Sequence, residues 1–155
     1  MIDNILDNSA FTVCTTAIIG TQDTDIDGTA VDMAGFEGVV FVMNIIDSSA
    51  TTDSIIGIIG AGSASSAGTF VDYTSATGAV QFDSTAANDG DDRLLVLDLY
   101  NVAERWVRPT VFGSSEIMHG ECIGIRYKNR KGIVSQSTAT DGVAASANFA
   151  TPTTA

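Results

Sequence analysis

The sharpest pattern of chemically active residues in the chain is a run of alternating aspartates. It is Asp23-Thr24-Asp25-Ile26-Asp27-Gly28, and it matches the opening of a calcium loop, in which alternating carboxylates converge on the ion and glycine allows a sharp turn. Position 12 of such a loop requires a bidentate glutamate, and the residue there is Ala34. An acidic, solvated turn is therefore the better interpretation, and we assign no metal ligand.

The second place for chemistry surrounds His119, the single histidine. Near it in sequence lie Ser114, Ser115, Glu116 and Glu121. Serine–histidine–acid catalysis needs an oriented nucleophile and an oxyanion hole, and the sequence has no G-x-S-x-G motif. One histidine and two isolated cysteines also give too few nitrogen and sulfur ligands for zinc. We therefore predict no catalytic residue, and we predict that the chain is not an enzyme.

A glycine-containing segment after an apolar run invites comparison with a dinucleotide-binding loop. It is Gly60-Ala61-Gly62-Ser63-Ala64-Ser65. The third glycine of the fingerprint is replaced by Ser65, and no helical pattern follows to direct its N-terminus at a pyrophosphate. We predict no bound cofactor, and we expect residues 60–68 to form a flexible loop of small residues.

The candidate functional residues that remain would contact another protein. Trp106 lies between Arg105 and Arg108, and tryptophan and arginine are enriched among the residues that dominate binding energy. Alternatively, Trp106 packs in the core, which is the more common position of a tryptophan in a small domain and the one favoured here. Arg126 begins a basic stretch that continues to Lys131. We predict that Arg105, Arg108 and Arg126 meet acidic groups of a protein partner, and Trp106 is a candidate anchor of the same interface.

Length and composition exclude several classes of protein. The chain has 155 residues, of which 45% are hydrophobic and 17% charged, so it can bury one core and is not disordered throughout. Its net charge of −12 disfavours nucleic acid and anionic membranes as partners. No apolar run approaches the roughly 20 residues of a membrane span, and the first residues lack the pattern of a signal peptide. Cys14 and Cys122 are predicted to be free, buried thiols in a reducing compartment.

The charge is distributed unevenly along the chain. Residues 1–92 contain fourteen acidic side chains and no lysine or arginine, whereas all seven basic residues fall between 93 and 131. Two interpretations follow. The chain associates with itself or with a partner of mixed charge, or the fold interleaves the two regions and neutralises them internally.

The elements that must position these residues are strands. Short apolar or β-branched segments separated by turn formers predict strands over residues 11–19, 39–46, 55–59, 94–100, 105–108 and 121–127. The run over 39–46 is apolar at nearly every position, which predicts a strand buried on both faces. Gly57 marks a bulge or a point of close packing. The pattern as a whole predicts an all-β fold, an antiparallel β-sandwich or jelly roll.

Two local predictions concern the strands near Trp106. The segments 94–100 and 105–108 flank a four-residue connection, and we expect them to form a β-hairpin. Pro109 cannot donate to a ladder, so we expect the second strand to end there or to lie at a sheet edge.

The C-terminal residues are poor in core material. From Ser135 to Ala155 the chain is mainly Ser, Thr, Ala and Gly, with Val143 and Phe149 as the sizeable apolar groups. Such a segment buries too little surface to offset its ordering entropy. We predict a β-sandwich domain over residues 1–134 and a flexible, extended tail over 135–155, which becomes ordered when a neighbouring subunit holds it.

Three blocks of sequence resemble a family of small tailed-bacteriophage virion proteins. The first is Asp27-Gly28-Thr29-Ala30-Val31-Asp32-Met33-Ala34-Gly35-Phe36-Glu37-Gly38-Val39-Val40-Phe41, similar to a "DG-x-x-VDM-x-GFE" turn before an apolar strand. The second is Arg105-Trp106-Val107-Arg108-Pro109, and the third runs from Cys122 to Lys131. The chain departs from the family pattern at Arg126, where glutamine is usual, and at Lys128, where glycine is usual.

The resemblance implies a structural role. Members of the family look like head decoration, or cement, proteins, which are often β-sandwich or jelly-roll trimers on the outside of a capsid. It implies that the major capsid protein and further copies of this chain, as a homotrimer, are the partners. It also implies that the protein is located in the virion, assembled in the host cytoplasm. No nucleic acid, membrane or cofactor is expected.

Two other functions stay open. One is another structural part of the virion, such as a tail, head-completion or fibre-base component. The other is a calcium-dependent carbohydrate-binding module that uses the aspartates at 23–27. A module of that kind needs an aromatic platform, and Tyr73, Tyr100 and Tyr127 are scattered along the sequence.

Overall fold

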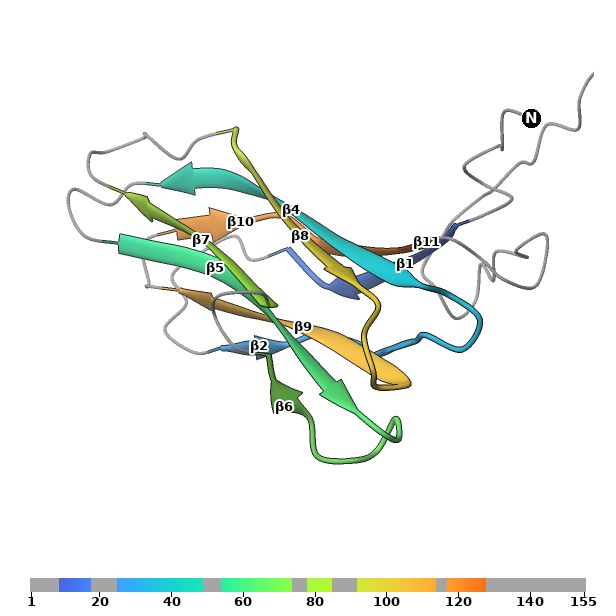
Figure 1. Cartoon of the computed structure of the whole chain (residues 1–155). Coiled ribbons are helices and arrows are strands. Elements are labelled where there is room, and N and C mark those ends of the chain that lie inside the picture. The colour runs from blue at the N-terminus through green and yellow to red at the C-terminus, as the bar shows by residue number, and fades with distance from the viewer. Residues whose placement is uncertain are drawn as a thin grey trace, which may run out of the picture.

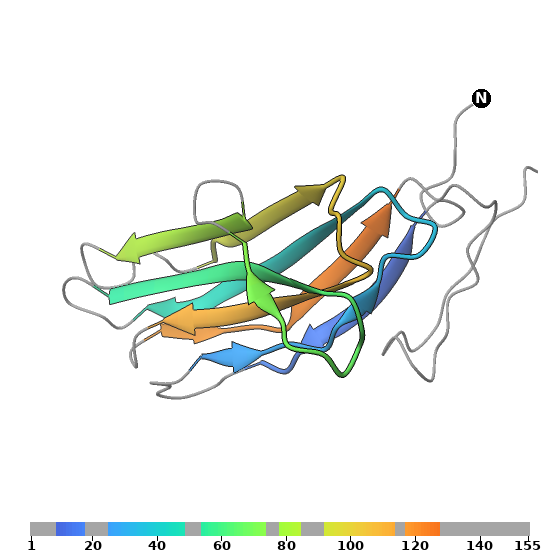
Figure 2. The same ribbon diagram turned by 60° about the horizontal axis from the view of Figure 1, so that its bottom comes forward.

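The chain folds as two antiparallel β-sheets that face each other. The computed structural model describes residues 9–17, 25–48, 54–73, 78–84, 92–113 and 117–127, and these residues form eleven strands. Figures 1 and 2 show the sheets as two layers with their strands running roughly along the length of the molecule. The predicted tail, residues 135–155, and the boundary of the predicted domain at residue 134 lie outside the described residues.

The two sheets are built from different parts of the chain. Sheet 1 contains β1 (Ala10–Thr15), β4 (Gly38–Ser48), β8 (Leu94–Tyr100), β10 (Ile117–His119) and β11 (Cys122–Tyr127). Sheet 2 contains β2 (Ile26–Asp27), β3 (Val31–Asp32), β5 (Ser54–Ser63), β6 (Val71–Asp72), β7 (Ala79–Ser84) and β9 (Trp106–Gly113). β4 is central in sheet 1, and β9 and β5 are central in sheet 2.

The order of pairing makes the sandwich a jelly roll. The first strand, β1, pairs with the last, β11, and inside this pair β2 and β3 pair with β9. Further inside, β4 pairs with β8, and β5 pairs with β7. Such nested antiparallel pairs, wrapped into two sheets, are the topology of the jelly roll. The predicted all-β class and antiparallel sandwich are confirmed.

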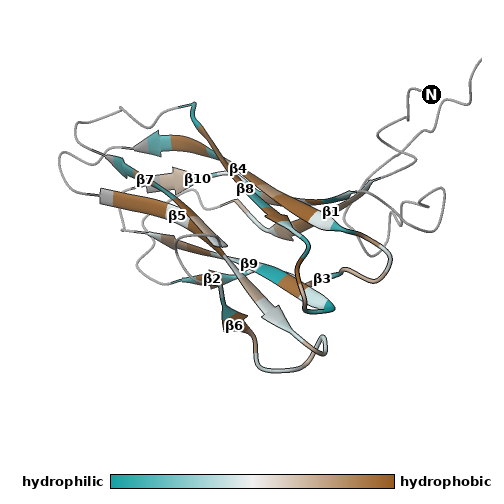
Figure 3. Ribbon diagram, in the orientation of Figure 1, coloured by the Kyte–Doolittle hydropathy of each residue, from teal (hydrophilic) through white to brown (hydrophobic). Residues whose placement is uncertain are grey.

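The core fills the space between the sheets and comes from alternate positions of the strands. β4 contributes Val39, Phe41, Met43 and Ile45, and β8 contributes Leu95, Leu97 and Leu99. The opposite sheet contributes Ile56, Ile58, Val107 and Val111. Figure 3 shows the apolar stretches of β4 and β5 facing each other across the sandwich. Gly57 of β5 marks close packing, as predicted, because a Cβ there would lie 2.3 Å from Cζ of Phe112.

The predicted hairpin over residues 94–108 is wrong. β8 pairs with β4 in sheet 1, whereas β9 pairs with β5 in sheet 2, so the connection crosses from one sheet to the other. It begins at Asn101, whose φ of 55° is left-handed, a conformation that asparagine tolerates better than most residues. A short connection can join two neighbouring strands of one sheet or cross from one sheet to the other. The alternation of apolar and polar residues along a strand does not show which strand it pairs with.

The expectation for Pro109 is also wrong, since β9 continues to Gly113 and lies inside the sheet. Ladder pairing on one side stops at Asp27, opposite Thr110, and resumes at Val31, opposite Val107. Residues 28–30 therefore lie beside the proline, where the ladder is already interrupted. The gap between β2 and β3 removes the need for the N–H that proline lacks.

Two further expectations need correction. Residues 60–63, expected to be part of a flexible loop, continue β5 and pair with β9 up to the register Ser63–Trp106. Trp106, for which core packing was favoured, is half-buried on the outside of β9, because Val107 takes the adjacent inward position. The fully buried aromatic side chain is Phe41.

The two cysteines are free and buried, as predicted. Cys14 lies on β1 and Cys122 on β11, and these two strands are neighbours. Burial raises the pKa of the Cys14 thiol to about 12 and raises that of Cys122 as well. Both thiols are therefore protonated at neutral pH and poor nucleophiles.

We expect neither thiol to react with a thiol reagent such as dithionitrobenzoate in the native protein. Both should react after unfolding in guanidinium, because unfolding exposes them and restores ordinary thiol pKa values. Counting released thionitrobenzoate before and after unfolding checks this. Rapid reaction of one or two thiols in the native protein would contradict the burial of this pair.

Candidate functional site

Three segments that are far apart in the sequence, residues 27–41, 105–109 and 122–127, are joined by backbone hydrogen bonds. The backbone N–H of Met33 donates to the carbonyl of Arg105 at 2.7 Å, and that of Glu37 donates to the carbonyl of Tyr127 at 3.2 Å. The N–H of Gly28 donates to the carbonyl of Pro109 at 2.8 Å. The segment 27–41 thus contacts both of the others, and the three segments form one structural junction.

Asp32 is the centre of this junction, and we call its contacts with two arginines the Asp32 clamp. Its carboxylate accepts hydrogen bonds from Nε and Nη2 of Arg105 at 3.1 and 2.9 Å. Its backbone carbonyl accepts a hydrogen bond from Nη1 of Arg126 at 3.0 Å. Arg105 precedes β9 of sheet 2, whereas Arg126 belongs to β11 of sheet 1, so the clamp joins the two sheets. The hydrogen bonds from Arg105 lower the pKa of the Asp32 carboxyl.

The chain then turns sharply between the sheets. The carboxylate of Asp32 also accepts a hydrogen bond from the N–H of Ala34 at 2.9 Å, and Phe36 donates back to Met33 at 3.0 Å. Gly35 has a φ of 91° at the third position of this turn. That geometry is a type II turn, in which glycine is favoured because a side chain at positive φ is strained. The Arg126 guanidinium lies 5.1 Å above the Phe36 ring.

A second ion pair lies on the outside of sheet 2. Nη2 of Arg108 is 2.7 Å from a carboxylate oxygen of Asp27, and the hydroxyl of Thr110 donates to the other oxygen at 2.9 Å. The Arg108 guanidinium also lies 4.6 Å above the Phe70 ring. Arg108 therefore has an acidic partner within its own chain.

These pairs support the second interpretation of the charge distribution. Asp27 and Asp32 belong to the acidic first part of the chain, and Arg105 and Arg108 to the basic part. The fold brings them together, so part of the opposite charge is neutralised internally. Of the predicted interface residues, Arg105 keeps the most accessible side chain, with 60% of its surface exposed, and its guanidinium lies 5.7 Å from the half-buried ring of Trp106.

The aspartate run does not gather as a calcium loop in the part that the structure describes. Asp27 is engaged by Arg108 and Thr110, Asp25 is exposed, and Asp23 lies outside the described residues. Among the described residues, no group of three or more His, Cys, Asp or Glu side chains could hold a metal ion.

His119 is buried, with 2% of its surface exposed. Its Nδ1 lies 2.7 Å from the carbonyl of Gly120, so Nδ1 carries the proton and donates, which leaves Nε2 as an acceptor. Nε2 is buried and has no hydrogen-bond partner. Burial lowers the pKa of the imidazole. His119 therefore stays neutral, and its register opposite buried Ile45 places it at the edge of the core.

The tyrosines that are scattered in sequence come together in space, which corrects the expectation drawn from their spacing. The rings of Tyr100 and Tyr127 stack with centroids 6.5 Å apart and an interplanar angle of 11°. Gly38 lies between them in the register of β8, β4 and β11. A Cβ at Gly38 would lie 2.3 Å from Cζ of Tyr127, so the absence of a side chain makes room for the ring.

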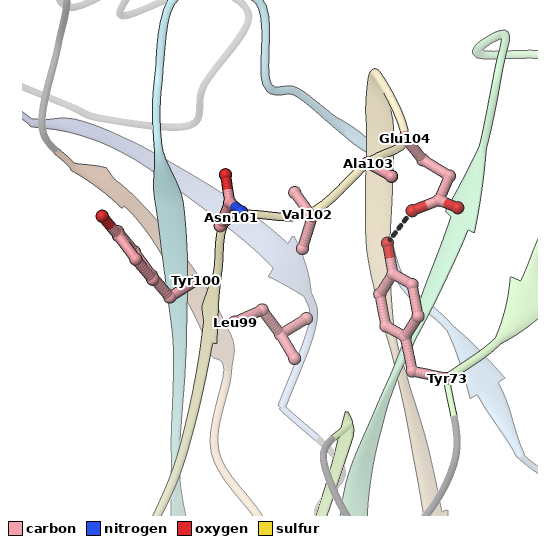
Figure 4. A pocket seen from close by; sticks show the side chains of 7 residues that line it. All are labelled: Tyr73, Leu99, Tyr100, Asn101, Val102, Ala103 and Glu104. Carbon is pink, nitrogen blue, oxygen red and sulfur yellow. Dashed lines mark hydrogen bonds between the residues drawn. The ribbon is translucent and has the colours of Figure 1, made fainter.

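Tyr73 and Tyr100 also line a pocket of about 330 Å³ where β8 ends. The other lining residues are Leu99, Asn101, Val102, Ala103 and Glu104. Figure 4 shows the hydroxyl of Tyr73 directed at Glu104, to which it donates a hydrogen bond at 2.9 Å. Burial and this hydrogen bond raise the pKa of Tyr73. The pocket offers one carboxylate, one amide and an apolar wall to a ligand.

The most unusual surface is the outer face of sheet 1. Val13, Ile123, Val42 and Val96 form one row across β1, β11, β4 and β8, because each is in register with the next. Ile125 and Val40 belong to the adjacent row, and Leu94 lies opposite Asn44. Val96 and Leu94 are 51% and 64% exposed. Asp98 is the one charged residue in the rows that β11, β4 and β8 share, and it accepts a hydrogen bond from Tyr127 at 2.6 Å.

Sequence reasoning did not select this face, although the signal was present. The apolar run 39–46 predicted a strand buried on both faces, but in the single chain Val39, Phe41, Met43 and Ile45 are buried while Val40 and Val42 are only half-buried. We name Val13, Val40, Val42, Leu94, Val96, Ile123 and Ile125 the apolar face.

No protein-family model and no curated protein sequence matches the chain. Two solved structures are weakly similar. A structure from a study of Bacillus endospore appendages that form disulfide-linked pili is 14% identical, covers 83% of this chain and 97% of its own, and has a TM-score of 0.37. The Eiger TNF of S. frugiperda is 9% identical, and the match covers 82% of this chain and 94% of the TNF chain, with a TM-score of 0.32. We base no argument on scores this low. No helix in the described part of the chain is long and apolar enough to cross a membrane.

We expect the free energy of unfolding to fall as the pH drops from about 7 to 5, with His119 as a main cause. The unfolded imidazole takes up a proton near pH 6.5, and the buried one resists it, so stability is full above that pH and is lost below it. The slope is at most about 1.4 kcal/mol per pH unit. Urea melts of the native protein and of His119→Gln check this, since the variant should lose the slope. An equal slope in both would show that other groups cause it.

Replacing Arg108 with alanine should lower the free energy of unfolding by about 1–2 kcal/mol, because an ion pair and a stacking contact are both lost. Arg108→Glu should cost more, since it places a second carboxylate beside Asp27. Denaturant melts of the two variants check the order. If both unfold like the native protein, the ion pair contributes nothing to the fold.

Proposed function

We propose that the chain is a capsid decoration protein of a tailed bacteriophage. It binds the outer surface of the head as a homotrimer and stabilises the shell by bridging subunits of the major capsid protein. On this proposal the protein has no enzymatic activity, needs no cofactor, and is part of the virion, assembled in the host cytoplasm.

The apolar face carries the proposal. Monomeric proteins rarely expose large contiguous apolar patches, and those that do usually bind other proteins there. A protein with such a face on a rigid sheet is suited to a lattice of repeated contacts. The jelly roll is compatible with this role, since it occurs in viral capsid domains, but it also occurs in lectins, so the fold alone decides nothing.

The resemblance to virion proteins supports the same proposal, because the three blocks that carry the resemblance lie together in the fold. The three blocks contact one another around Asp32. Proteins of one structural family keep the same fold. Residues that hold a junction of that fold together are therefore the ones such a family would share. Arg105 is the most accessible residue of the predicted interface, and we propose it as a contact to acidic groups of the capsid, with the half-buried Trp106 beside it.

Decoration would act by mass action. A protein that binds the assembled shell and not its dissociated subunits stabilises the shell. Three copies joined in a trimer bind together, so each single contact can be weak.

Another structural part of the virion is the alternative that the apolar face also fits. The copy number separates the two, because a decoration protein approaches the major capsid protein in abundance and a tail part is far rarer. The calcium-dependent carbohydrate-binding alternative is less well supported, since Asp27 is occupied by Arg108 and Thr110.

Heads that lack this protein should release their genome at a lower temperature than decorated heads, and adding the purified protein back should restore the difference. The physical reason is the lost binding free energy of many copies on each shell. Fluorescence of a DNA-binding dye during a thermal ramp measures the release. Identical release temperatures for stripped and decorated heads would refute the proposal.

A further inference from the structure

We infer that the apolar face is the surface through which copies of this chain pack against one another. The inference goes beyond the proposed function: a self-complementary face joins two copies about a two-fold axis, whereas the contacts that close a trimer join two different patches. It rests on the geometry of sheet 1.

The first argument is that the outer positions of sheet 1 have the composition of a core. On β11 the inner face carries Cys122 and Gly124, whereas the outer face carries the larger Ile123 and Ile125. On β1, Cys14 on the inner face is likewise smaller than Phe11 and Val13 on the outer face. A sheet in contact with water on one side normally alternates apolar and polar residues. Here both sides are apolar, which is typical of a sheet covered on both faces.

The second argument comes from charge. The chain carries −12 overall, and copies that approach through an acidic surface repel each other. On the outer face, the rows shared by β11, β4 and β8 contain one charged residue, Asp98, which lies on the edge strand β8 and accepts a hydrogen bond from Tyr127. Two copies that meet through this face therefore bury aliphatic side chains, and each Asp98 lies toward the rim.

The third argument is size. The apolar face spans four strands about 4.8 Å apart and three rows about 6.8 Å apart, which gives an area of about 400 Å². The largest apolar patch on a typical monomer has an area of about 300–600 Å² and is often functional, so this face has the size of such a patch. Two such faces bury about 800 Å², so contacts at the rim are needed to reach the roughly 1,200 Å² of a stable interface. Tyr100, 58% exposed at one end of the face, is placed to supply such a contact.

A second copy fits this face better than an unrelated partner because the surface is complementary to itself. Val13, Val42, Val96 and Ile123 are side chains of similar size and form regular rows, as on the inner faces of packed sheets. A face of this kind needs no matching charge or donor on the other side. The same patch can thus serve both copies of a pair related by a two-fold axis.

The test is the mass of the free protein and of two matched variants by size-exclusion chromatography with light scattering. Val96→Glu places a carboxylate on the apolar face, and Val71→Glu places one at a 67% exposed position on β6 of sheet 2. We expect the native protein and Val71→Glu to have a multiple of 16.0 kDa, and Val96→Glu to lose association and approach the mass of one chain. A native mass of one chain, an unchanged Val96→Glu, or equal loss in both variants would overturn the inference.

A second measurement covers the case that Val96→Glu does not fold. Val96→Cys and Val71→Cys each add one accessible thiol, while Cys14 and Cys122 are buried. Alkylation at position 96 should slow as the protein concentration rises, and alkylation at position 71 should not. Slow alkylation at position 96 at every concentration would mean that the chain covers its own face. Protection only on capsids would mean that a capsid subunit covers it. Either result would overturn the inference.

The outcomes separate this inference from the proposed function. If the free chain is monomeric but decorated heads are more heat-stable, the inference about the face fails and the capsid role stands. If copies associate through the face but heads gain no stability, the capsid role fails and the interface stands. A mass of two chains would keep the interface and refute the proposed trimer.

Discussion

The arrangement of sheet 1 depends on how the chain is held where it crosses from β3 to β4. A strand with one apolar face has its register set by burial, because a shift of one residue would expose every core side chain. Between Val39 and Met43, β4 is apolar on both faces, so over this stretch a shift would exchange Val40 and Val42 for Val39 and Phe41, and the loss of hydrophobic burial would be small; the polar Asn44 opposes such a shift. The Asp32 clamp and the turn at Gly35 define where β4 begins. Gly38, the first residue of β4, then lies beneath the ring of Tyr127, where a Cβ would collide with the ring.

The clamp also explains why opposite charges lie in different parts of the chain. The jelly roll pairs early strands with late ones, so β3 comes to lie beside β9, and β1 beside β11. Acidic residues early in the chain and arginines late in the chain then meet across these pairs, as Asp27 meets Arg108. The uneven charge distribution in the sequence thus becomes local pairing in the fold.

The functional proposals follow from what the fold leaves uncovered. Burial between the sheets uses one side of β4, β8 and β11, and leaves Val42, Val96 and Ile123 on the other. Arg105 and Arg108, which the sequence singles out, form ion pairs with Asp32 and Asp27 of the same chain. The aliphatic residues on the outer face of sheet 1 have no such partners within the described part of the chain. We therefore propose the apolar face for contacts between copies and, if the chain decorates a capsid as proposed, the region of Arg105 for contacts with it.

The sequence by itself determined the all-β class, most of the strands and the burial of the cysteines, because these depend on local alternation and on residue type. It also contained the sign that β4 is apolar on both faces. It did not reveal that β8 and β9 belong to different sheets, that Pro109 lies beside a break in the ladder, or that Tyr100 and Tyr127 stack. These features depend on which strands pair, and pairing between distant segments is decided by the packing of the whole sandwich, which alternation within one strand does not encode.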